Sequence, residues 1–319
     1  MQHFKFVILG AAKIAPKFIE AARLVPQVEI AAVASKSKQR AEQMADKFQI
    51  PKAYDDYETM LVEERPDAAY ICVTPNDHFR LTMLCIRHHI PVLCEKAMFQ
   101  NSQEALDAFA AAKEAGVFVM EAMWSRFLPP TQKLKSWLAQ GIIGRPETVH
   151  TTLGFRADPD PENRYMNPKL GGGAAKDLTV YTYEQTVYII GEPVVHVQAD
   201  ALWGPSGVDM TDHVYVRFPE TIAELVSSFA AQLSNKIEIR GPKGYMVMPD
   251  VNMPTECTLY RTDGTVVESF TDTETKNGFT YEIEEVVRCV RQGLLESPVV
   301  PWQTTIDCAR VFDQIDATK

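Results

Sequence analysis

The strongest constraint on the fold is a regular alternation of buried strands and amphipathic helices through the first third of the chain. Continuous apolar runs at 4–9, 28–35 and 68–74 have the length of strands that are covered on both faces. The rest of the series consists of helices at 14–25, 38–48, 77–88 and 102–115 and strands at 91–95 and 117–121. This alternation predicts a doubly wound parallel sheet, in which ligands bind at the carboxyl ends of the strands.

After residue 122 the pattern becomes that of an α+β domain. Short strands separated by turn signals predominate between 194 and 270. The other expected elements are a helix at 130–140, a strand at 146–154, a loop at 157–169, and helices at 171–190, 281–292 and 304–316. We therefore predict an α/β dinucleotide-binding Rossmann domain over residues 1–122. Residues 123–319 are predicted to form an α+β substrate-binding and oligomerisation domain with a large, mostly antiparallel open sheet.

Charge and cysteine spacing exclude several classes of partner. The formal net charge of -10 opposes binding of nucleic acid or an anionic membrane through the overall field. No apolar run approaches the ~20 residues that span a bilayer, and the chain enters its first strand without an export signal. The six cysteines show no CxxC spacing, so we expect no metal site, and they fit a reducing, cytoplasmic location. Cys72 and Cys94 are expected to pack as small hydrophobes.

A degenerate G-x-G-x-x-G/A fingerprint joins the first strand to the first helix. Gly10 supplies the tight turn, Ala12 stands at the second glycine position, and Ala15 is small enough for close packing of helix on strand. Lys13 and Ile14 complete the turn, at a helix amino terminus that attracts phosphate. An ordinary strand–helix turn without a ligand is the alternative. The position in the first βαβ unit favours a dinucleotide.

The end of the second strand indicates which dinucleotide. An NAD site places a carboxylate there to bind the ribose 2′-hydroxyl, and this sequence has no acid at that point. It has Ser35 and Lys36, with Arg40 one turn later, and a hydroxyl and cations suit a 2′-phosphate. The alternative is a solvated basic helix start. We predict a preference for NADP(H), with NAD(H) possible.

Several motifs resemble those of the glucose–fructose oxidoreductase/inositol dehydrogenase (Gfo/Idh/MocA) family. The segment CEKA at 94–97 resembles its Glu-Lys-Pro signature, and TPNDH at 74–78 its Thr-Pro-Asn-x-x-His. Residues 171–181 resemble its Gly-Gly-Gly-Ala-x-x-Asp-x-Gly-x-Tyr/His segment. Residues 120–129 look most like the dimeric dihydrodiol dehydrogenase branch, and the likeness continues at 239–244. Each motif is modest in specificity, but the motifs occur in the family's order over nearly the whole chain.

The resemblance implies that Lys96, Asp177 and Tyr181 are the catalytic residues. The cofactor-binding positions that it implies beyond the first turn are Thr74, Pro75, Asn76, His78, Glu95 and Lys96. Trp124 and Phe155 are weaker candidates for walls of the substrate cleft, because aromatic residues in such runs more often pack in the core.

Three residues depart from the family pattern. Ala97 replaces a proline that is often cis, and a cis bond before alanine costs ~3 kcal/mol, so we expect a trans Lys96–Ala97 peptide. Thr179 replaces a glycine and is expected to add bulk near the substrate. Ala12 replaces a glycine, which the family tolerates. These departures bear on the identity of the substrate more than on the class of reaction.

The same residues fit the chemistry of hydride transfer to or from an alcohol carbon, which requires one proton to move at the oxygen. Asp177 and Tyr181 are four residues apart and share one helix face. A nearby ammonium such as that of Lys96 would lower the pKa of a tyrosine from ~10, so that Tyr181 could act as acid/base. Asp177 would orient Lys96 or the substrate. Taken singly, each residue is more often a solvated strand end, a helix cap or a core tyrosine, but together, at the family's positions, the three favour catalysis.

The leading hypothesis is an NADP(H) oxidoreductase acting on a sugar, polyol or cyclic diol/carbonyl. A non-catalytic NADP-binding sensor and a redox-assisted glycosidase with tightly bound NAD are the alternatives. The predicted strands after 194 outnumber the helices that could cover them, so an uncovered apolar sheet face should be buried by a second copy of the chain. We expect at least a homodimer.

Overall fold

The protein is described by a computed structural model that covers residues 3–319. The chain divides into two compact units. The first contains the described residues up to 124 together with 276–306, and the second contains 125–275 together with 307–319. The predicted boundary at 122/123 lies two residues from the observed one. The structure differs from the prediction in grouping 276–306 with the first unit.

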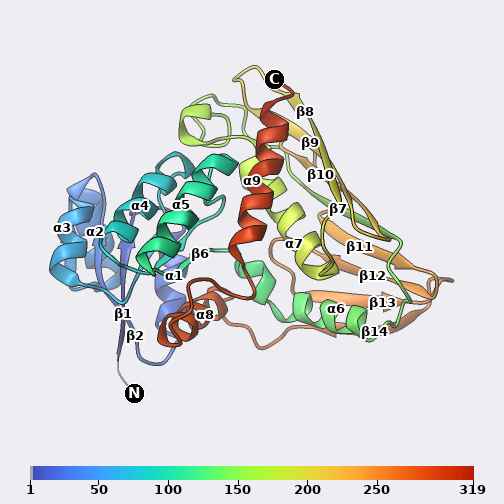
Figure 1. Ribbon diagram of the computed structural model, residues 1–319, viewed down its shortest axis with the longest axis horizontal. Helices are drawn as coiled ribbons and strands as arrows, with labels where there is room; N and C mark the ends of the chain where they lie inside the picture. The colour runs from blue at the N-terminus through green and yellow to red at the C-terminus, as the bar shows by residue number, and fades with distance from the viewer. Residues whose placement is uncertain (1–2) are drawn as a thin grey trace. The chain divides into compact units, whose positions relative to one another are not determined.

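The first unit is built on a parallel sheet of six strands in the order β3-β2-β1-β4-β5-β6 (Figure 1). The strands are β1 (Phe4–Leu9), β2 (Val28–Ala34), β3 (Lys52–Tyr54), β4 (Ala68–Ile71), β5 (Val92–Cys94) and β6 (Val119–Glu121). The helices are α1 (Ala15–Ala22), α2 (Lys38–Phe48), α3 (Tyr57–Glu64), α4 (His78–Arg87), α5 (Ser102–Ala115) and α8 (Phe279–Arg291). The doubly wound sheet is confirmed. Because the strand order reverses between β1 and β4, the carboxyl ends of these two strands form the topological switch point at which ligands bind.

Local sequence signals begin the helices of this unit. The side chains of Ser37, Asp56 and Asn101 each accept a hydrogen bond from the amide three residues further on, at the starts of α2, α3 and α5. The sequence pattern predicted no strand at β3 and no helix at α3. β3 has only three residues and pairs with β2 alone, so it is too short to show a periodic pattern.

The segment 276–306 is tied to the first unit by hydrogen bonds and packing. The Asn277 side chain donates to the carbonyl of Lys17 (2.8 Å), and the Trp302 indole donates to the carbonyl of Val119 (2.8 Å). The Thr305 hydroxyl donates to Glu121 at 2.8 Å, and α8 packs on α1. These partners lie more than 180 residues away in sequence. A domain boundary predicted from the local sequence pattern therefore assigned the segment to the second domain, with the residues that precede and follow it.

The second unit contains an eight-stranded sheet in the order β14-β13-β12-β11-β7-β10-β9-β8, antiparallel except for the β7–β10 pair. Its strands are β7 (Thr148–Gly154), β8 (His196–Trp203), β9 (Asp209–Arg217), β10 (Ile222–Ser228), β11 (Lys236–Gly241), β12 (Gly244–Pro249), β13 (Glu256–Tyr260) and β14 (Val266–Thr271). Its helices are α6 (Pro129–Ala139), α7 (Val180–Ile190) and the last part of α9 (Trp302–Asp316). The predicted α+β domain with a large, mostly antiparallel sheet is confirmed.

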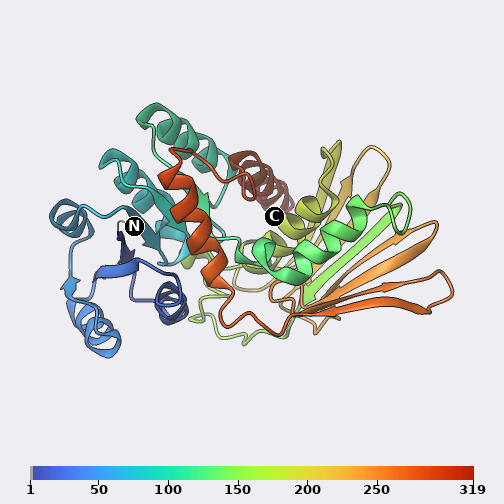
Figure 2. The ribbon, with the colours of Figure 1, turned by 90° about the horizontal axis from the view of Figure 1, so that it is seen from below.

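The helices of the second unit lie on one face of its sheet, and in both ribbon views no described helix of this unit covers the other face (Figures 1 and 2). The open face is not the uniformly apolar surface that we expected. Leu202 (71% exposed) and Ile222 (44% exposed) are apolar, and Tyr245 stacks on Tyr260 with ring centroids 4.6 Å apart. They alternate with polar residues that pair across the strands: His150, Thr152, Glu224, Glu238 and Arg240.

Two further sequence expectations concern the whole chain. All six cysteines are buried and free, so Cys72 and Cys94 pack as small hydrophobes as predicted. Within residues 3–319, no helix combines the length and apolarity that a membrane crossing requires.

Candidate active site

The turn after β1 has the geometry of a dinucleotide-binding turn. Gly10 has φ +121°, and a Cβ there would meet the backbone of Cys72 and Val73 at 3.0 Å. Glycine is therefore required on both conformational and steric grounds. Helix α1 begins five residues later with Pro16 in its first turn and no side-chain cap, and the amides of Ala15 and Lys17 donate to the carbonyls of Ala12 and Ile14 at 3.2 and 3.0 Å. The turn fits the pyrophosphate of a dinucleotide.

One of the basic residues after β2 contacts this turn. Arg40 donates from Nη2 to the carbonyl of Ala11 at 2.6 Å, which ties the start of α2 to the glycine turn. Ser37 caps α2, and Ser35 is buried. Arg40 therefore lies beside the predicted phosphate turn, although the two were inferred from separate motifs.

Lys36 has a partner that the sequence analysis did not identify. Its Nζ lies 2.5 Å from Asp77 Oδ2, and Asp77 Oδ1 accepts from Arg80 at 3.0 Å. The two cations hold the pKa of Asp77 below its usual range, although partial burial acts in the opposite direction. Asp77 lies in the turn after β4. A carboxylate that is absent from the end of β2 is therefore supplied by the turn after a neighbouring strand. Local sequence could not reveal this pair, because 41 residues separate the partners.

The loops after β4 and β5 are joined through a buried histidine. His78 is 1% exposed, and its ring nitrogens lie 3.0 Å from the carbonyl oxygen of Val73 and 2.9 Å from that of Ala97. Burial lowers the pKa of His78. The structure thus places His78 inside the fold, where it supports the segment that carries Lys96. In the turn just before it, Thr74 and Pro75 are partly buried and Asn76 is exposed.

The expectation of a trans Lys96–Ala97 peptide was wrong, because the bond is cis. The expectation used only the local preference of an alanine peptide. It left out the tertiary contacts that fix the following residues. Ala97 is 1% exposed with its carbonyl against His78, and the amide of Met98 donates to Glu121 at 2.9 Å.

Glu95 belongs to a buried acidic pair at the end of β5. The Tyr70 hydroxyl donates to it, and burial raises its pKa, against the opposing effects of Tyr70 and Lys96. Glu282 on α8 is 0% exposed, and neither carboxylate oxygen has a hydrogen-bond partner among the described residues. Burial and the charge of Glu95 raise the pKa of Glu282 well above its usual range, while Lys17 opposes them.

This pairing predicts a pH-dependent stability effect. A carboxyl whose pKa is raised by folding keeps its proton in the folded state while the unfolded state loses it above pH ~4.3, so stability falls as pH rises. Glu282→Gln removes this loss. We expect its melting temperature to rise relative to the parent between pH 5 and pH 8. The exposed neighbour Glu284→Gln is the matched control and should show no such trend. A Glu282→Gln advantage that does not grow with pH would contradict the assignment.

Trp124 lies in the first unit and is 8% exposed. Its ring packs on Phe279 with centroids 5.1 Å apart, and the Lys17 ammonium lies 4.2 Å from its centroid. Within its unit, then, the core-packing interpretation of Trp124 is the better supported. Phe155, in the second unit, is partly exposed and packs edge-on against Tyr165 and Phe229 at 5.7 and 5.3 Å.

In the second unit, Asp177 and Tyr181 lie on one continuous helical stretch. We predicted an α-helix from the glycines onward, but the structure forms a π-helical turn over Ala175–Thr179 before α7 begins. The amide of Val180 donates to the carbonyl of Ala175, five residues back, which defines this turn. Asp177 lies within the π-helical turn, and Tyr181, 7% exposed, lies in the first turn of α7.

Asp177 has a cationic partner that the sequence analysis missed. Arg164 Nη2 lies 3.3 Å from Asp177 Oδ1, and the guanidinium stacks over Tyr165 at 4.2 Å. The Asp177 carboxylate raises the pKa of Arg164, although burial lowers it. Arg164 lies in the loop rich in Asp, Pro and Asn, where nothing in the local pattern distinguishes it from a solvated cation.

Thr179 does not add bulk to an open site as we expected. It is 0% exposed and points into the unit, where its hydroxyl donates to Asp212 Oδ2 at 2.6 Å. Thr179 lies two residues after Asp177 on the helical stretch, so the two side chains point to different faces of it. The threonine that replaces the family glycine therefore changes how the helix is held on the sheet.

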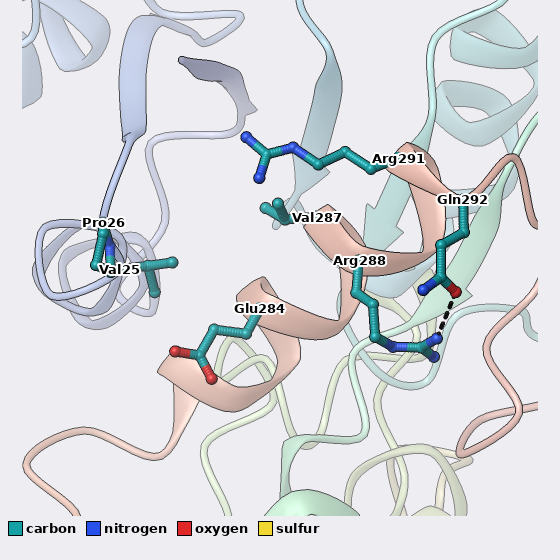
Figure 3. A pocket seen from close by; sticks show the side chains of 7 residues that line it. All are labelled: Val25, Pro26, Glu284, Val287, Arg288, Arg291 and Gln292. Atoms are coloured by element: carbon teal, nitrogen blue, oxygen red, sulfur yellow. Dashed lines mark hydrogen bonds between the residues drawn. The ribbon is translucent and has the colours of Figure 1, made fainter. Parts of the chain in front are cut away.

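Two other features carry no ligand site. Within residues 3–319, no three His, Cys, Asp or Glu side chains are grouped as metal ligands, and His213 is an exposed residue of β9. A surface pocket of about 380 Å³ lies between the end of α1 and α8 and contains none of the predicted site residues (Figure 3). Arg288, which lines this pocket, donates hydrogen bonds to Gln292 and to both carboxylate oxygens of Glu285.

Comparisons with known proteins cover both units. Residues 4–123 match the "Oxidoreductase family, NAD-binding Rossmann fold", and residues 131–247 match the "GFO/IDH/MocA C-terminal domain". A trans-1,2-dihydrobenzene-1,2-diol dehydrogenase of Mus musculus is 33% identical over 315 residues, covering 96% of this chain and 94% of that protein. The aldose-aldose oxidoreductase of Caulobacter crescentus superposes with a TM-score of 0.90 at 22% identity, covering 99% and 97% of the two chains. A 3-ketoreductase of Actinomadura kijaniata, solved with NADP and TDP-benzene, gives 0.89 at 22% identity, covering 99% and 98%.

Proposed function

Because the chain belongs to the Gfo/Idh/MocA oxidoreductase family and is an NAD(P)-dependent dehydrogenase or reductase, we propose that it uses NADP(H) and acts on a sugar, polyol or cyclic diol/carbonyl. The substrate class is supported by the relative that oxidises a dihydrodiol and by the fold shared with an aldose oxidoreductase. The observation that carries the cofactor proposal is the contact of Arg40 with the carbonyl of Ala11 in the Gly10 turn.

The preference for NADP(H) rests on charge. Arg40 is anchored on the turn through Ala11, and Lys36 is paired with Asp77. Lys36, Arg40 and Arg80 carry three positive charges against the single negative charge of Asp77, and the excess suits a 2′-phosphate dianion. NAD(H), which lacks that phosphate, would leave the excess charge without a partner.

Lys36→Ala is expected to weaken NADPH binding by about tenfold, equivalent to 1–2 kcal/mol for a charged hydrogen bond. Its effect on NADH should be small, because the lost partner is the 2′-phosphate. Lys38→Ala, at an exposed lysine two residues away, is the matched control and should leave both affinities unchanged. Dissociation constants by calorimetry decide the question. Equal affinity of the parent for NADH and NADPH would refute the preference.

The proposed chemistry assigns one role to each of three side chains. A bound nicotinamide supplies the hydride chemistry. Tyr181 would give or take the proton at the substrate oxygen, and Lys96 would stabilise negative charge developing there. Asp177, held by Arg164 at 3.3 Å, would orient the substrate hydroxyl. The six buried thiols support a reducing, cytoplasmic compartment as the place of work.

The open sheet face is the proposed surface for a homodimer. Leu202 and Ile222 are large apolar side chains exposed on that face, and its paired polar residues could satisfy one another across a two-fold interface. We expect light scattering at micromolar concentration to give at least twice the mass of one chain. Leu202→Glu/Ile222→Glu should give the monomer, whereas Leu106→Glu, at an exposed leucine on α5, should not. A monomeric parent protein would rule the dimer out.

A further inference from the structure

Two buried aspartates lie directly beneath the helical stretch that carries Asp177. Asp209 is 2% exposed and Asp212 is 0% exposed, and both belong to β9. Asp209 Oδ2 accepts from the amide of Ala175 at 2.5 Å, and Asp212 Oδ2 accepts from the hydroxyl of Thr179 at 2.6 Å. Ala175 and Thr179 are the first and last residues of the π-helical turn. The two carboxyls therefore bind its two ends.

The glycine turn before the helix is shaped around the same pair. Gly173 has φ +122°, and a Cβ there would lie 2.1 Å from Asp209 Oδ1. The amide of Gly173 also donates to the carbonyl of Tyr165 at 3.0 Å, next to the Arg164 that holds Asp177. Asp209 thus packs against the glycine backbone while it caps the π-helical turn.

A single proton on the two aspartates would reduce the negative charge that is buried at this site. Asp212 Oδ1 is buried with no donor among the described residues, and burial and the neighbouring Asp209 raise the pKa of Asp212 well above its usual range. Burial also raises the pKa of Asp209. The other charged groups that act on the pair are Lys176, which is 9% exposed, and Asp316 on α9, 3.8 Å from the Lys176 ammonium. One ammonium and one shared proton would leave little uncompensated charge.

Further along, α7 rests on the sheet through hydroxyl contacts. Thr182 meets Ser227 of β10 at 3.2 Å, and Thr186 meets Thr151 of β7 at 2.7 Å. All four are buried. The Thr182 hydroxyl also donates to the carbonyl of Thr179 at 3.2 Å. Thr186 touches neither end of the π-helical turn, so Thr186 provides the matched control for Thr179.

We propose that Asp209 and Asp212, sharing one proton, are positioning residues that hold the helix at Ala175–Thr179 in the π form and so set the direction of the Asp177 side chain. The proposal rests on the proposed function for the role of Asp177. A relaxed α-helical turn accommodates one residue fewer than a π turn, so its formation would rotate the side chains before Val180 by about 100° relative to Tyr181. Thr179 is the link through which Asp212 acts.

The test compares three threonine variants by amide hydrogen exchange and kinetics. Thr179→Val keeps the shape but loses the donor, Thr179→Ser keeps the donor, and Thr186→Val is the control. We expect Thr179→Val to lose protection of the Val180 amide and at least about tenfold in kcat, with an unchanged KM for NADPH. Thr179→Ser and Thr186→Val should keep that protection and most of kcat.

The pH dependence provides a second arm. A folded-state pKa raised above the unfolded value means that the stabilisation is present at low pH and is lost as pH rises through the folded pKa. Protection of the Val180 amide in the parent should therefore fall at alkaline pH. Asp212→Asn keeps a donor toward Asp209 and an acceptor for Thr179 at every pH, so its protection should not fall.

The two failures are distinguishable. Protection of Val180 that survives in Thr179→Val overturns the clamp whether or not the protein is a dehydrogenase. Protection that is lost with kcat unchanged overturns the positioning role of the pair. A parent protein that turns over no substrate refutes the proposed function, and then unchanged exchange in Thr179→Val would refute the clamp as well.

Discussion

Tyr181→Phe is expected to lower kcat/KM by a factor on the order of 10²–10⁴, because it removes the group proposed to move the proton at the substrate oxygen. NADPH affinity should fall much less than kcat, since the phenol is proposed to meet the substrate and not the cofactor. Tyr183→Phe, at a 1% exposed tyrosine of the same helix, is the matched control and should retain nearly full activity. Near-normal turnover in Tyr181→Phe would defeat the assignment and make Asp177 the next candidate base.

Lys96→Ala should cost a similar factor, because the proposed alkoxide-stabilising charge is lost. The double variant should be little worse than either single one, since groups that act on the same step are strongly non-additive. Steady-state kinetics of the four enzymes measures this coupling. Effects that multiply in the double variant would show that the two residues act independently.

Arg126→Met is expected to destabilise the second unit by about 3–5 kcal/mol, because it leaves a buried carboxylate without its cation. Arg126 is 1% exposed and Glu184 is 0% exposed, and the two form an ion pair through Nη2 and Oε2. The same Nη2 donates to the backbone carbonyl of Glu184 at 2.9 Å. Glu184 lies one turn after Tyr181 on α7, so this pair anchors the helix that carries the proposed acid/base.

The companion variant Arg126→Met/Glu184→Leu should recover most of the loss, since apolar residues of similar volume often replace a buried pair without cost. Because the two units can unfold separately, amide exchange of α7 measures the relevant free energy better than a single global transition. A double variant less stable than Arg126→Met alone would contradict this interpretation of the pair.

The sequence predicted best where structure is decided locally. β1, β2 and β4 are mainly apolar runs, which is typical of strands covered on both faces. Helix α5 is capped by Asn101 at its start and by Gly116 at its end, and both caps are recognisable in the sequence. The Gly10 turn was recognisable because its conformation admits little besides glycine. The family motifs identified Lys96, Asp177 and Tyr181 as candidates through the order and spacing of the motif residues.

The features that sequence did not reveal depend on partners far apart in the chain. Asp77 meets Lys36 across 41 residues, and Glu282 reaches Glu95 from the last tenth or so of the chain. The π-helical turn, the inward direction of Thr179 and the cis bond after Lys96 are each fixed by tertiary contacts that local propensity does not contain. The open face of the second sheet was expected to be apolar because strands were counted without their register.

Hydride transfer between a substrate and NADP(H) is tested most directly by the absorbance of reduced nicotinamide. The parent protein is incubated with NADP⁺ or NAD⁺ and a panel of trans-dihydrodiols, inositols and aldoses. We expect formation of NADPH with at least one class of compound, about tenfold faster than formation of NADH at limiting nucleotide, and loss of this activity in Tyr181→Phe. Tight binding of the nucleotide without its reduction in the presence of any compound would contradict hydride transfer and favour a sensor. Cofactor that stays bound and is regenerated while a glycoside is cleaved would favour the redox-assisted glycosidase.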